Sequence, residues 1–240
     1  MIPLAILAGG LATRLRPITE VIPKSLIEIE GKPFVHWQLL QLAKAGFTSI
    51  VLCVSYKSDL IESYLGSGAR YGLKIQYSHD GPSQVGTGGA IIKALPLLGD
   101  KFMVLYGDSY LPINYQLVER KFFACEEPAL MTVYMNKGKY DSSNVTFSNG
   151  KLISYKKETK SPDYTYIDYG LSCFDHLIFE KYLRDEPLDL GQIFTDLSAQ
   201  KMLAGYEATE RFYEIGSHQG IREFSAYVEG NLNELQPKTS

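Results

Sequence analysis

Two glycines and several side chains suited to phosphate binding stand together near the start of the chain. An apolar run over residues 3–8 stops at Gly9-Gly10, and Thr13 and Arg14 follow shortly after. Glycine has no Cβ, so the backbone N–H groups of such a turn are open to an approaching phosphate. A hydroxyl adds a donor, and a guanidinium binds two phosphate oxygens in a bidentate fork. The spacing predicts a phosphate-binding turn, although a tight strand-to-loop turn would use the same glycine pair.

The chain as a whole carries no surplus of positive charge. Its formal net charge is −3, and its 17 tyrosines are scattered rather than interleaved with basic residues. This balance argues against a broad nucleic-acid or membrane surface, so a polyanionic ligand must meet a local cluster of positive charge. Neither the cysteines (Cys53, Cys125 and Cys173) nor the four histidines show a metal-binding spacing. No apolar run is long enough to span a membrane, and a cytoplasmic location follows as the default.

Strands and helices alternate through the first half of the chain. Apolar runs predict strands at 3–8, 49–54, 73–78, 101–106 and 129–135. Helical patterns between them predict helices at 33–45, 58–65, 87–98 and 114–125. Such alternation is typical of a mostly parallel sheet covered by helices on both faces. The rhythm then changes, because Asn149-Gly150 predicts a hairpin turn between strands at 144–148 and 151–155, with another strand at 166–174.

The expected fold class is therefore α/β, a three-layer α/β/α arrangement around a mixed, mostly parallel central sheet. With 240 residues the chain is long enough for one large domain and too short for two comfortable ones. We expect a single domain over 1–230, with a nucleotide-binding half at 1–135 and a half at 136–230 that shapes the partner substrate. Further helices are expected near 176–182, 191–203 and 217–227, followed by a flexible tail at 231–240.

The longer string from Leu7 to Pro17, with Thr19 and Pro23-Lys24 after it, resembles the signature of the sugar-1-phosphate nucleotidyltransferases, also called nucleotide-sugar pyrophosphorylases. The likeness continues at 86–90 (Gly-Thr-Gly-Gly-Ala), 106–108 (Tyr-Gly-Asp) and 214–217 (Glu-Ile-Gly-Ser), and so covers about the first 230 residues. It is nearest to the short, single-domain branch of heptose-1-phosphate guanylyltransferases and muramyl-phosphate uridylyltransferases. The resemblance implies a Rossmann-like fold of the nucleotide-diphospho-sugar transferase type.

The resemblance also implies how a nucleoside triphosphate would be held. Arg14 would bind the β- and γ-phosphates, and Lys24 would lie between the α-phosphate and the sugar phosphate, where it offsets the repulsion between two anions. Asp80 would help to read the base; a carboxylate only accepts hydrogen bonds, and two donors on one edge favour guanine slightly over the other bases. The implied nucleotide-binding residues are Leu7, Ala8, Gly9, Gly10, Thr13, Asp80, Gly86 and Thr87.

A magnesium site is expected beside these residues. Asp108 follows a buried strand and a glycine, and so would lie at the carboxyl edge of the sheet. Mg²⁺ prefers hard oxygen ligands and usually binds one or two carboxylates together with substrate phosphates. The resemblance makes Glu214 the second carboxylate, at a position where relatives usually carry Asp. Arg14, Lys24 and Asp108 are thus the expected catalytic residues, and Asp108 and Glu214 the expected metal ligands.

The sugar would be held by the second half of the chain. The resemblance implies contacts from Glu158 and from the segment at 168–170, where relatives often carry Asn in place of Asp168. Tyr110 and Asn144 are further candidates on position alone. The expected sugar-binding residues are Tyr110, Asn144, Glu158, Asp168 and Gly170.

The activity that follows is transfer of a nucleoside monophosphate from its triphosphate to a sugar 1-phosphate, with release of pyrophosphate. GTP with a heptose or hexose 1-phosphate is the favoured pair, Mg²⁺ the expected cofactor, and a monomer or homodimer the expected assembly. Two alternatives stay open. One is a cytidylyltransferase acting on an alcohol phosphate, which would need an aromatic or acidic cage for a quaternary amine. The other is a nucleotide-binding regulatory protein without catalysis, which the departure at Glu214 alone favours.

Overall fold

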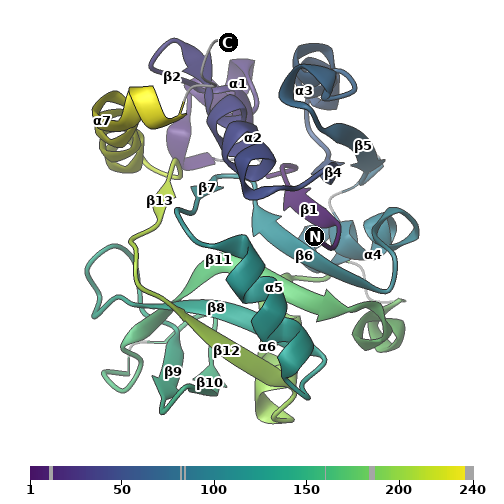
Figure 1. Cartoon of the computed structure of the whole chain (residues 1–240), viewed down its shortest axis with the longest axis vertical. Helices are drawn as coiled ribbons and strands as arrows, with labels where there is room; N and C mark the ends of the chain where they lie inside the picture. Colours follow the sequence, from purple (N-terminus) through teal and green to yellow (C-terminus); the bar gives the residue numbers. More distant parts are fainter. Residues whose placement is uncertain (11–12, 82, 84, 160, 184–186, 236–240) are drawn as a thin grey trace.

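The structure is a computed structural model that describes residues 1–10, 13–81, 83, 85–159, 161–183 and 187–235. Its described part is built around one nine-stranded sheet with helices on both sides (Figure 1). The expected three-layer α/β/α architecture with a mixed, mostly parallel sheet is confirmed.

Seven strands cross the sheet in the order β12-β8-β11-β6-β1-β4-β5. β11 is antiparallel to both of its neighbours, β6 and β8, whereas the other pairs along this path are parallel. The hairpin of β9 and β10 joins at the start of β11, where Tyr166 lies opposite Val145. The bounds are β1 Leu4–Leu7, β4 Ser49–Val54, β5 Lys74–His79, β6 Lys101–Tyr106, β8 Ala129–Met135, β9 Val145–Ser148, β10 Lys151–Tyr155, β11 Tyr166–Asp175 and β12 Leu203–Ala208.

The strands are nearly continuous apolar runs because helices cover both faces of the sheet. Successive side chains of a strand point to opposite faces, so Leu4 and Ile6 pack into one core cluster and Ala5 into the other. The first cluster lies under α2 (Phe34–Ala45), α3 (Ser58–Leu65) and α5 (Tyr115–Ala124). The second lies under α4 (Gly86–Leu98), the 3-10 helix η4 (His176–Tyr182) and α6 (Leu190–Ala199).

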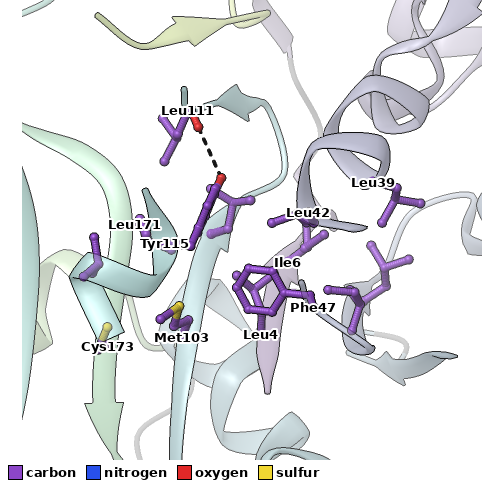
Figure 2. Packing of buried hydrophobic residues seen from close by; sticks show 14 of the residues in the cluster. Leu4, Ile6, Leu39, Leu42, Phe47, Met103, Leu111, Tyr115, Leu171 and Cys173 are labelled. Atoms are coloured by element: carbon purple, nitrogen blue, oxygen red, sulfur yellow. Dashed lines mark hydrogen bonds between the residues drawn. The ribbon is translucent and has the colours of Figure 1, made fainter. Parts of the chain in front are cut away.

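Figure 2 shows the first cluster from close by. Leu4 and Ile6 of β1 lie beneath the α2 side chains Leu39 and Leu42, with residues of β6 and β11 beside them. Tyr115 is almost fully buried, and its hydroxyl donates to the Leu111 carbonyl at 3.4 Å (Figure 2). The polar end of this large side chain is therefore satisfied within an otherwise apolar layer.

The helix α7 (His218–Leu235) forms a third core cluster with the start of α2. Phe224 of α7 packs edge-on against Phe34, with 5.1 Å between ring centroids. The nearby Trp37 Nε1 donates to the Ile29 carbonyl at 2.9 Å. The remaining short elements are η1 Thr13–Leu15, α1 Ile18–Val21, η2 Lys24–Leu26, β2 Glu28–Ile29, β3 Lys32–Pro33, η3 Ala69–Tyr71, β7 Ser109–Tyr110 and β13 Tyr213–Glu214.

Most boundaries agree with the sequence-based prediction, and the differences have local causes. The strands at 49–54, 101–106 and 129–135 agree to the residue, and Asn149 and Gly150 both have the positive φ of the predicted turn. The helix expected to reach Leu203 ends at Ala199, because Lys201 adopts φ 58° and Leu203 already begins β12. Conversely, α7 continues to Leu235, so residues 231–235, expected in a flexible tail, are helical; residues 236–240 lie outside the described residues. Across the described ranges, no helix combines the length and apolar character needed to cross a bilayer.

We predict that Phe174→Ala destabilises the fold by about 3–5 kcal/mol, the usual cost of removing a buried phenyl ring. Phe174 is 0% exposed and stacks on Phe194 with 5.6 Å between centroids. Urea denaturation followed by circular dichroism measures the change. Phe123→Ala is the matched control, because that ring is 57% exposed and should change stability by less than about 0.5 kcal/mol. Equal losses in the two variants would contradict the burial described for the second cluster.

Candidate functional site

A cavity of about 570 Å³ opens at the carboxyl ends of β1, β4 and β6. In open α/β sheets, ligands bind beyond the carboxyl ends of the strands, where the connecting loops converge. Nine of the expected site residues line it, together with residues that the sequence did not single out. Its lining comprises Leu7, Ala8, Gly9, Gly10, Lys24, Ser25, Cys53, Asp80, Gly86, Thr87, Ala90, Tyr106, Gly107, Asp108 and Pro187.

The glycine pair of the predicted phosphate-binding turn lies in the wall of the cavity. A Cβ on Gly9 would lie 3.2 Å from Asp80 Oδ2 and 3.1 Å from Ser55 Cβ, so this residue is pressed against the neighbouring loop. Apart from its chain neighbours, no described residue has a heavy atom within 4 Å of the Cβ position of Gly10, so these residues leave its backbone approachable. Leu11 and Ala12 of the same motif lie outside the described residues, and so does the side chain of Thr13.

Lys24 and Asp108 form an ion pair in this wall. Lys24 Nζ lies 2.5 Å from Asp108 Oδ2, and the two side chains are 19% and 30% exposed. They come from sequence positions far apart, because Lys24 begins the short helix η2 and Asp108 follows β6. The pair places one cation and one anion at the cavity, where each remains accessible to a ligand of opposite charge.

The loop that carries Asp108 is braced from both sides. The buried Gln38 of α2 donates through Nε2 to the carbonyls of Tyr106, at 3.1 Å, and Ser109, at 2.8 Å. The Asp108 carbonyl accepts a hydrogen bond from Ile215 N at 3.0 Å. Ser109 Oγ donates to Asp108 Oδ1 at 3.3 Å. These contacts fix the position of the Asp108 carboxylate relative to the sheet.

Glu214 comes close to Asp108 because β13 pairs with β7, which sets Glu214 opposite Ser109. Burial, and then the negative charge of Asp108, raise the pKa of Glu214, while Lys24 and Arg14 act in the opposite direction. Two carboxylates held together in this way favour a cation between them, and hard oxygen donors suit Mg²⁺. No group of three or more potential metal ligands occurs among the described residues, but two carboxylates suffice where substrate phosphates complete the shell.

The expected base-reading residues also line the cavity. Asp80 is 8% exposed, and burial raises its pKa against the opposing effects of Lys93 and His79. Gly86 has φ 78°, and a Cβ there would lie 2.3 Å from the Leu188 carbonyl oxygen. The Thr87 hydroxyl accepts from Leu190 N at 2.8 Å. Gly86 and Thr87 therefore anchor the chain before α6 against the start of α4, in addition to facing the cavity.

Three of the expected sugar-binding residues meet at the start of β11. The Asp168 backbone N–H donates to Asn144 Oδ1 at 2.9 Å, and Gly170 N donates to Asp168 Oδ1 at 3.0 Å. The register of β11 against β8 shifts between Asp168 and Ser172, so the strand bends at this point. Glu158 is exposed beyond the end of β10, and the structure gives it no part in this cluster.

Tyr110 is the one expected sugar-binding residue that the structure buries elsewhere. It is 2% exposed and packs against Phe224 and Tyr227, with ring centroids 4.9 and 5.6 Å away. The pairing of Tyr110 with Tyr213 in the β7–β13 ladder turns it under α7 rather than into the cavity wall. Arg14 is exposed on η1, outside the lining set, though close enough to Glu214 to lower its pKa.

Two hydroxyl-bearing residues of the wall were not among the expected site residues. Tyr106 ends β6 and was quoted as part of the Tyr-Gly-Asp motif without a role of its own; it lines the cavity, and its hydroxyl donates to Asp168 Oδ2. Ser25 is 3% exposed, and its hydroxyl has no hydrogen-bond partner within the described chain. The available signal for Tyr106 was its own place in the motif at 106–108, and for Ser25 its position directly after Lys24.

Two proteins of known activity are similar to this chain in sequence. An N-acetylmuramate alpha-1-phosphate uridylyltransferase from Neisseria meningitidis serogroup B is 42% identical over 111 residues, 46% of this chain and 48% of that protein. A D-glycero-alpha-D-manno-heptose 1-phosphate guanylyltransferase from Aneurinibacillus thermoaerophilus is 28% identical over 221 residues, 91% of this chain and 94% of that protein. The first alignment thus spans about half the length of the relative it matches, and the second nearly all of it.

The fold and the family have separate support. The structure of an inositol-1-phosphate CTP transferase from T. maritima matches with a TM-score of 0.80, covering 100% of this chain and 98% of that one. At 20% identity this likeness shows the fold alone. The family model described as nucleotidyl transferase matches residues 4–231, which is nearly the entire sequence. The chain therefore belongs to the nucleotidyl transferase family.

Proposed function

We propose that this protein transfers a nucleoside monophosphate from its triphosphate to a sugar 1-phosphate and releases pyrophosphate. The observation that carries the proposal is the Lys24–Asp108 pair, set in a cavity that the glycine turn after β1 also lines. A cation, an anion and open backbone N–H groups are what two phosphate-bearing substrates and a divalent metal need within one cavity. Relatives named for this reaction with muramate and heptose 1-phosphates support it.

The reaction we propose is a direct displacement. An oxygen of the sugar 1-phosphate forms a bond to the α-phosphorus, and the bond from that phosphorus to the leaving pyrophosphate breaks in line with it. No general base is required, because the attacking phosphate is already an anion at neutral pH. Lys24 lowers the repulsion between the two anions, and the N–H groups around Gly9 and Gly10 bind the triphosphate. Arg14, at the rim, stabilises the charge of the pyrophosphate as it leaves.

Asp108 and Glu214 are the residues we assign to hold Mg²⁺. When bound, the ion neutralises phosphate charge and helps to orient the triphosphate. The two carboxylates fit this role, because they lie near each other and the pKa of Glu214 is raised by burial and by Asp108. Glu has one methylene more than the Asp usual in relatives, and it still brings its carboxylate within electrostatic reach of Asp108.

For the substrates we propose GTP with a heptose or hexose 1-phosphate. Asp80 faces the cavity and, when ionised, accepts hydrogen bonds only, so it suits the adjacent N1–H and N2–H₂ donors of guanine. The heptose 1-phosphate guanylyltransferase that aligns over 91% of this chain supports the pair. A cytoplasmic location and assembly as a monomer or homodimer stay predictions.

The experiment that tests the function is pyrophosphate release with Mg²⁺ across the common nucleoside triphosphates. Each would be combined with heptose, mannose, glucose and N-acetylhexosamine 1-phosphates, and with phosphocholine as an alcohol phosphate. We expect release to require one sugar 1-phosphate and one triphosphate together, with the nucleotide-sugar identified by mass spectrometry. Release with phosphocholine would indicate the cytidylyltransferase alternative. Triphosphate binding without release from any pair would indicate a regulatory protein.

We predict that Asp108→Asn lowers kcat by about 100-fold or more, because it removes a carboxylate that stabilises charge through the metal. The variant should also bind Mn²⁺ more weakly in calorimetric titrations, which separates loss of the metal from other causes. Asp100→Asn is the control, because its side chain is 94% exposed and lies away from the cavity lining. Near-normal turnover and Mn²⁺ binding in Asp108→Asn would overturn the assignment.

A further prediction concerns the effect of Glu214 on the stability of the fold at different pH values. Because the pKa of Glu214 is raised in the folded chain, the ionised carboxylate destabilises the fold at neutral pH, and protonation removes this penalty as the pH falls. Without metal at pH 7.5, Glu214→Gln should therefore melt at a higher temperature than the wild type, and the difference should shrink towards pH 4. Added Mg²⁺ should raise the melting temperature of the wild type more than that of the variant.

Differential scanning fluorimetry measures both effects in the Glu214→Gln series. Glu229→Gln is the control, because Glu229 is exposed on α7 and its substitution should leave both quantities unchanged. A wild type that melts higher than Glu214→Gln at pH 7.5 without metal would contradict the cost of burying this carboxylate. Equal Mg²⁺ responses in the two proteins would contradict its role as a ligand.

A further inference from the structure

A tyrosine and an aspartate bridge the two halves of the site beside the residues assigned above. Tyr106 ends β6 and is one of the residues that line the cavity. Its hydroxyl donates to Asp168 Oδ2 at 3.1 Å, across the antiparallel pair of β6 and β11. Gly170 has φ 108°, a backbone conformation that favours glycine, and its Cβ position lies 3.5 Å from Tyr106 Cδ2, so β11 packs against the tyrosine at this point. The pair therefore sits where the nucleotide half meets the second half of the chain.

The hydrogen bonds of Asp168 fix the direction of this contact. Its Oδ1 accepts from Gly170 N at 3.0 Å, and its own backbone N–H is held by Asn144 Oδ1 at 2.9 Å. Burial raises the pKa of Asp168 to about 6. The hydrogen bonds that its carboxylate accepts from Gly170 N and from the Tyr106 hydroxyl oppose that rise. The carboxyl group is thus mostly ionised above pH 7, and a carboxylate can only accept hydrogen bonds. The proton of the Tyr106 hydroxyl must then point to Asp168.

The other titratable groups near Tyr106 and Asp168 do not change the direction of the hydrogen bond between them. Burial and the Asp168 charge raise the pKa of Tyr106 well above its ordinary value, so its hydroxyl keeps its proton. Lys157 Nζ lies 2.6 Å from Asp189 Oδ2, so the positive charge of this lysine is already paired. Tyr155, which is buried nearby, also has a raised pKa, chiefly because of its burial and then because of Asp168 and Asp189. With its proton committed, the Tyr106 oxygen has only lone pairs left for a ligand.

We propose that Tyr106, oriented by Asp168, is a specificity-determining residue that accepts a hydrogen bond from the sugar 1-phosphate. The substrates that fit are sugar 1-phosphates with a hydroxyl or an amide N–H directed at the Tyr106 oxygen. An analogue without that donor binds more weakly. This inference rests on the proposed function. Tyr106 would contact the substrate, whereas Asp168 is a positioning residue that acts through it.

The direction of the hydrogen bond between Tyr106 and residue 168 can be reversed by a substitution that barely changes the shape of the side chain. In the Asp168→Asn variant, the amide oxygen remains the partner of the Gly170 N–H, which leaves the NH₂ group facing the Tyr106 oxygen. The amide then donates to Tyr106, and the tyrosine proton becomes free to donate to the ligand. A fluorine in place of a sugar hydroxyl can accept but never donate, and so it distinguishes the two states.

The test uses the sugar 1-phosphate that the wild type accepts, and its analogues in which each hydroxyl in turn is replaced by fluorine, or the amide N–H by N-methyl. At one position we expect the replacement to raise the KM for the sugar 1-phosphate by about 10–100-fold in the wild type, the usual effect of leaving a buried acceptor unpaired. Tyr106→Phe should abolish this discrimination while the KM for the triphosphate changes less than about 2-fold. Asp168→Asn should reduce the penalty for a fluorinated analogue by about 10-fold or more.

Tyr182→Phe is the matched control, because Tyr182 also donates to an aspartate, Asp196, at 2.7 Å, but lies outside the cavity lining. It should leave every KM unchanged. A wild type that discriminates at no position overturns the inference without any variant having to fold. Unchanged discrimination in both Tyr106→Phe and Asp168→Asn overturns it while the proposed function stands. A wild type that is silent with every substrate pair overturns the proposed function, and the inference with it.

Discussion

The close approach of β1 and β6 at their carboxyl ends is the constraint on which the site depends. The Gly107 N–H donates to the Leu7 carbonyl at 3.0 Å, and a Cβ on Gly107 would lie only 2.4 Å from that oxygen. The glycine therefore allows the turn after β1 and the carboxylate after β6 to share one cavity wall. Lys24, which comes from a separate loop, completes the arrangement through its charge. A parallel sheet supplies such a meeting point because all its carboxyl ends lie at one edge.

Three carboxylates around this edge are held at an electrostatic cost. Burial raises the pKa values of Asp80, Glu214 and Asp168, so the folded chain keeps each charge in surroundings that disfavour it. The groups around these carboxylates differ. Asp168 accepts hydrogen bonds from Gly170 and Tyr106, whereas Glu214 lies within electrostatic reach of the Asp108 carboxylate. Glu214, whose pKa is raised partly by the charge of Asp108, lies where we assign the metal. Strain of this kind is common where a ligand supplies the missing interaction.

The sequence predicted the parts of the fold that depend on local pattern. β4, β6 and β8 are apolar runs ended by polar or glycine residues, and their boundaries agree to the residue. The glycine turn, Lys24, Asp80 and Asp108 were found because each directly follows a predicted strand or belongs to a recognised string. The pairing of strands that are far apart in the sequence could not be predicted from such local patterns. Tyr110 is turned under α7 by β13, a strand more than 100 residues later, and no local signal indicates that contact.

The same reasoning explains why Tyr106 was not among the expected site residues and why it matters. A tyrosine at the end of an apolar strand fits a core position, and only the antiparallel β11 gives its hydroxyl a partner. β11 enters the sheet in the opposite direction to β6, so its first residues, rather than its last, reach the edge that holds the cavity. This reversal lets the second half of the chain place Asp168 beside a residue of the first half. On the role proposed for Tyr106, substitutions at Asn144, Asp168 or Gly170 would alter substrate selection while Lys24 and Asp108, which belong to other elements, keep their positions.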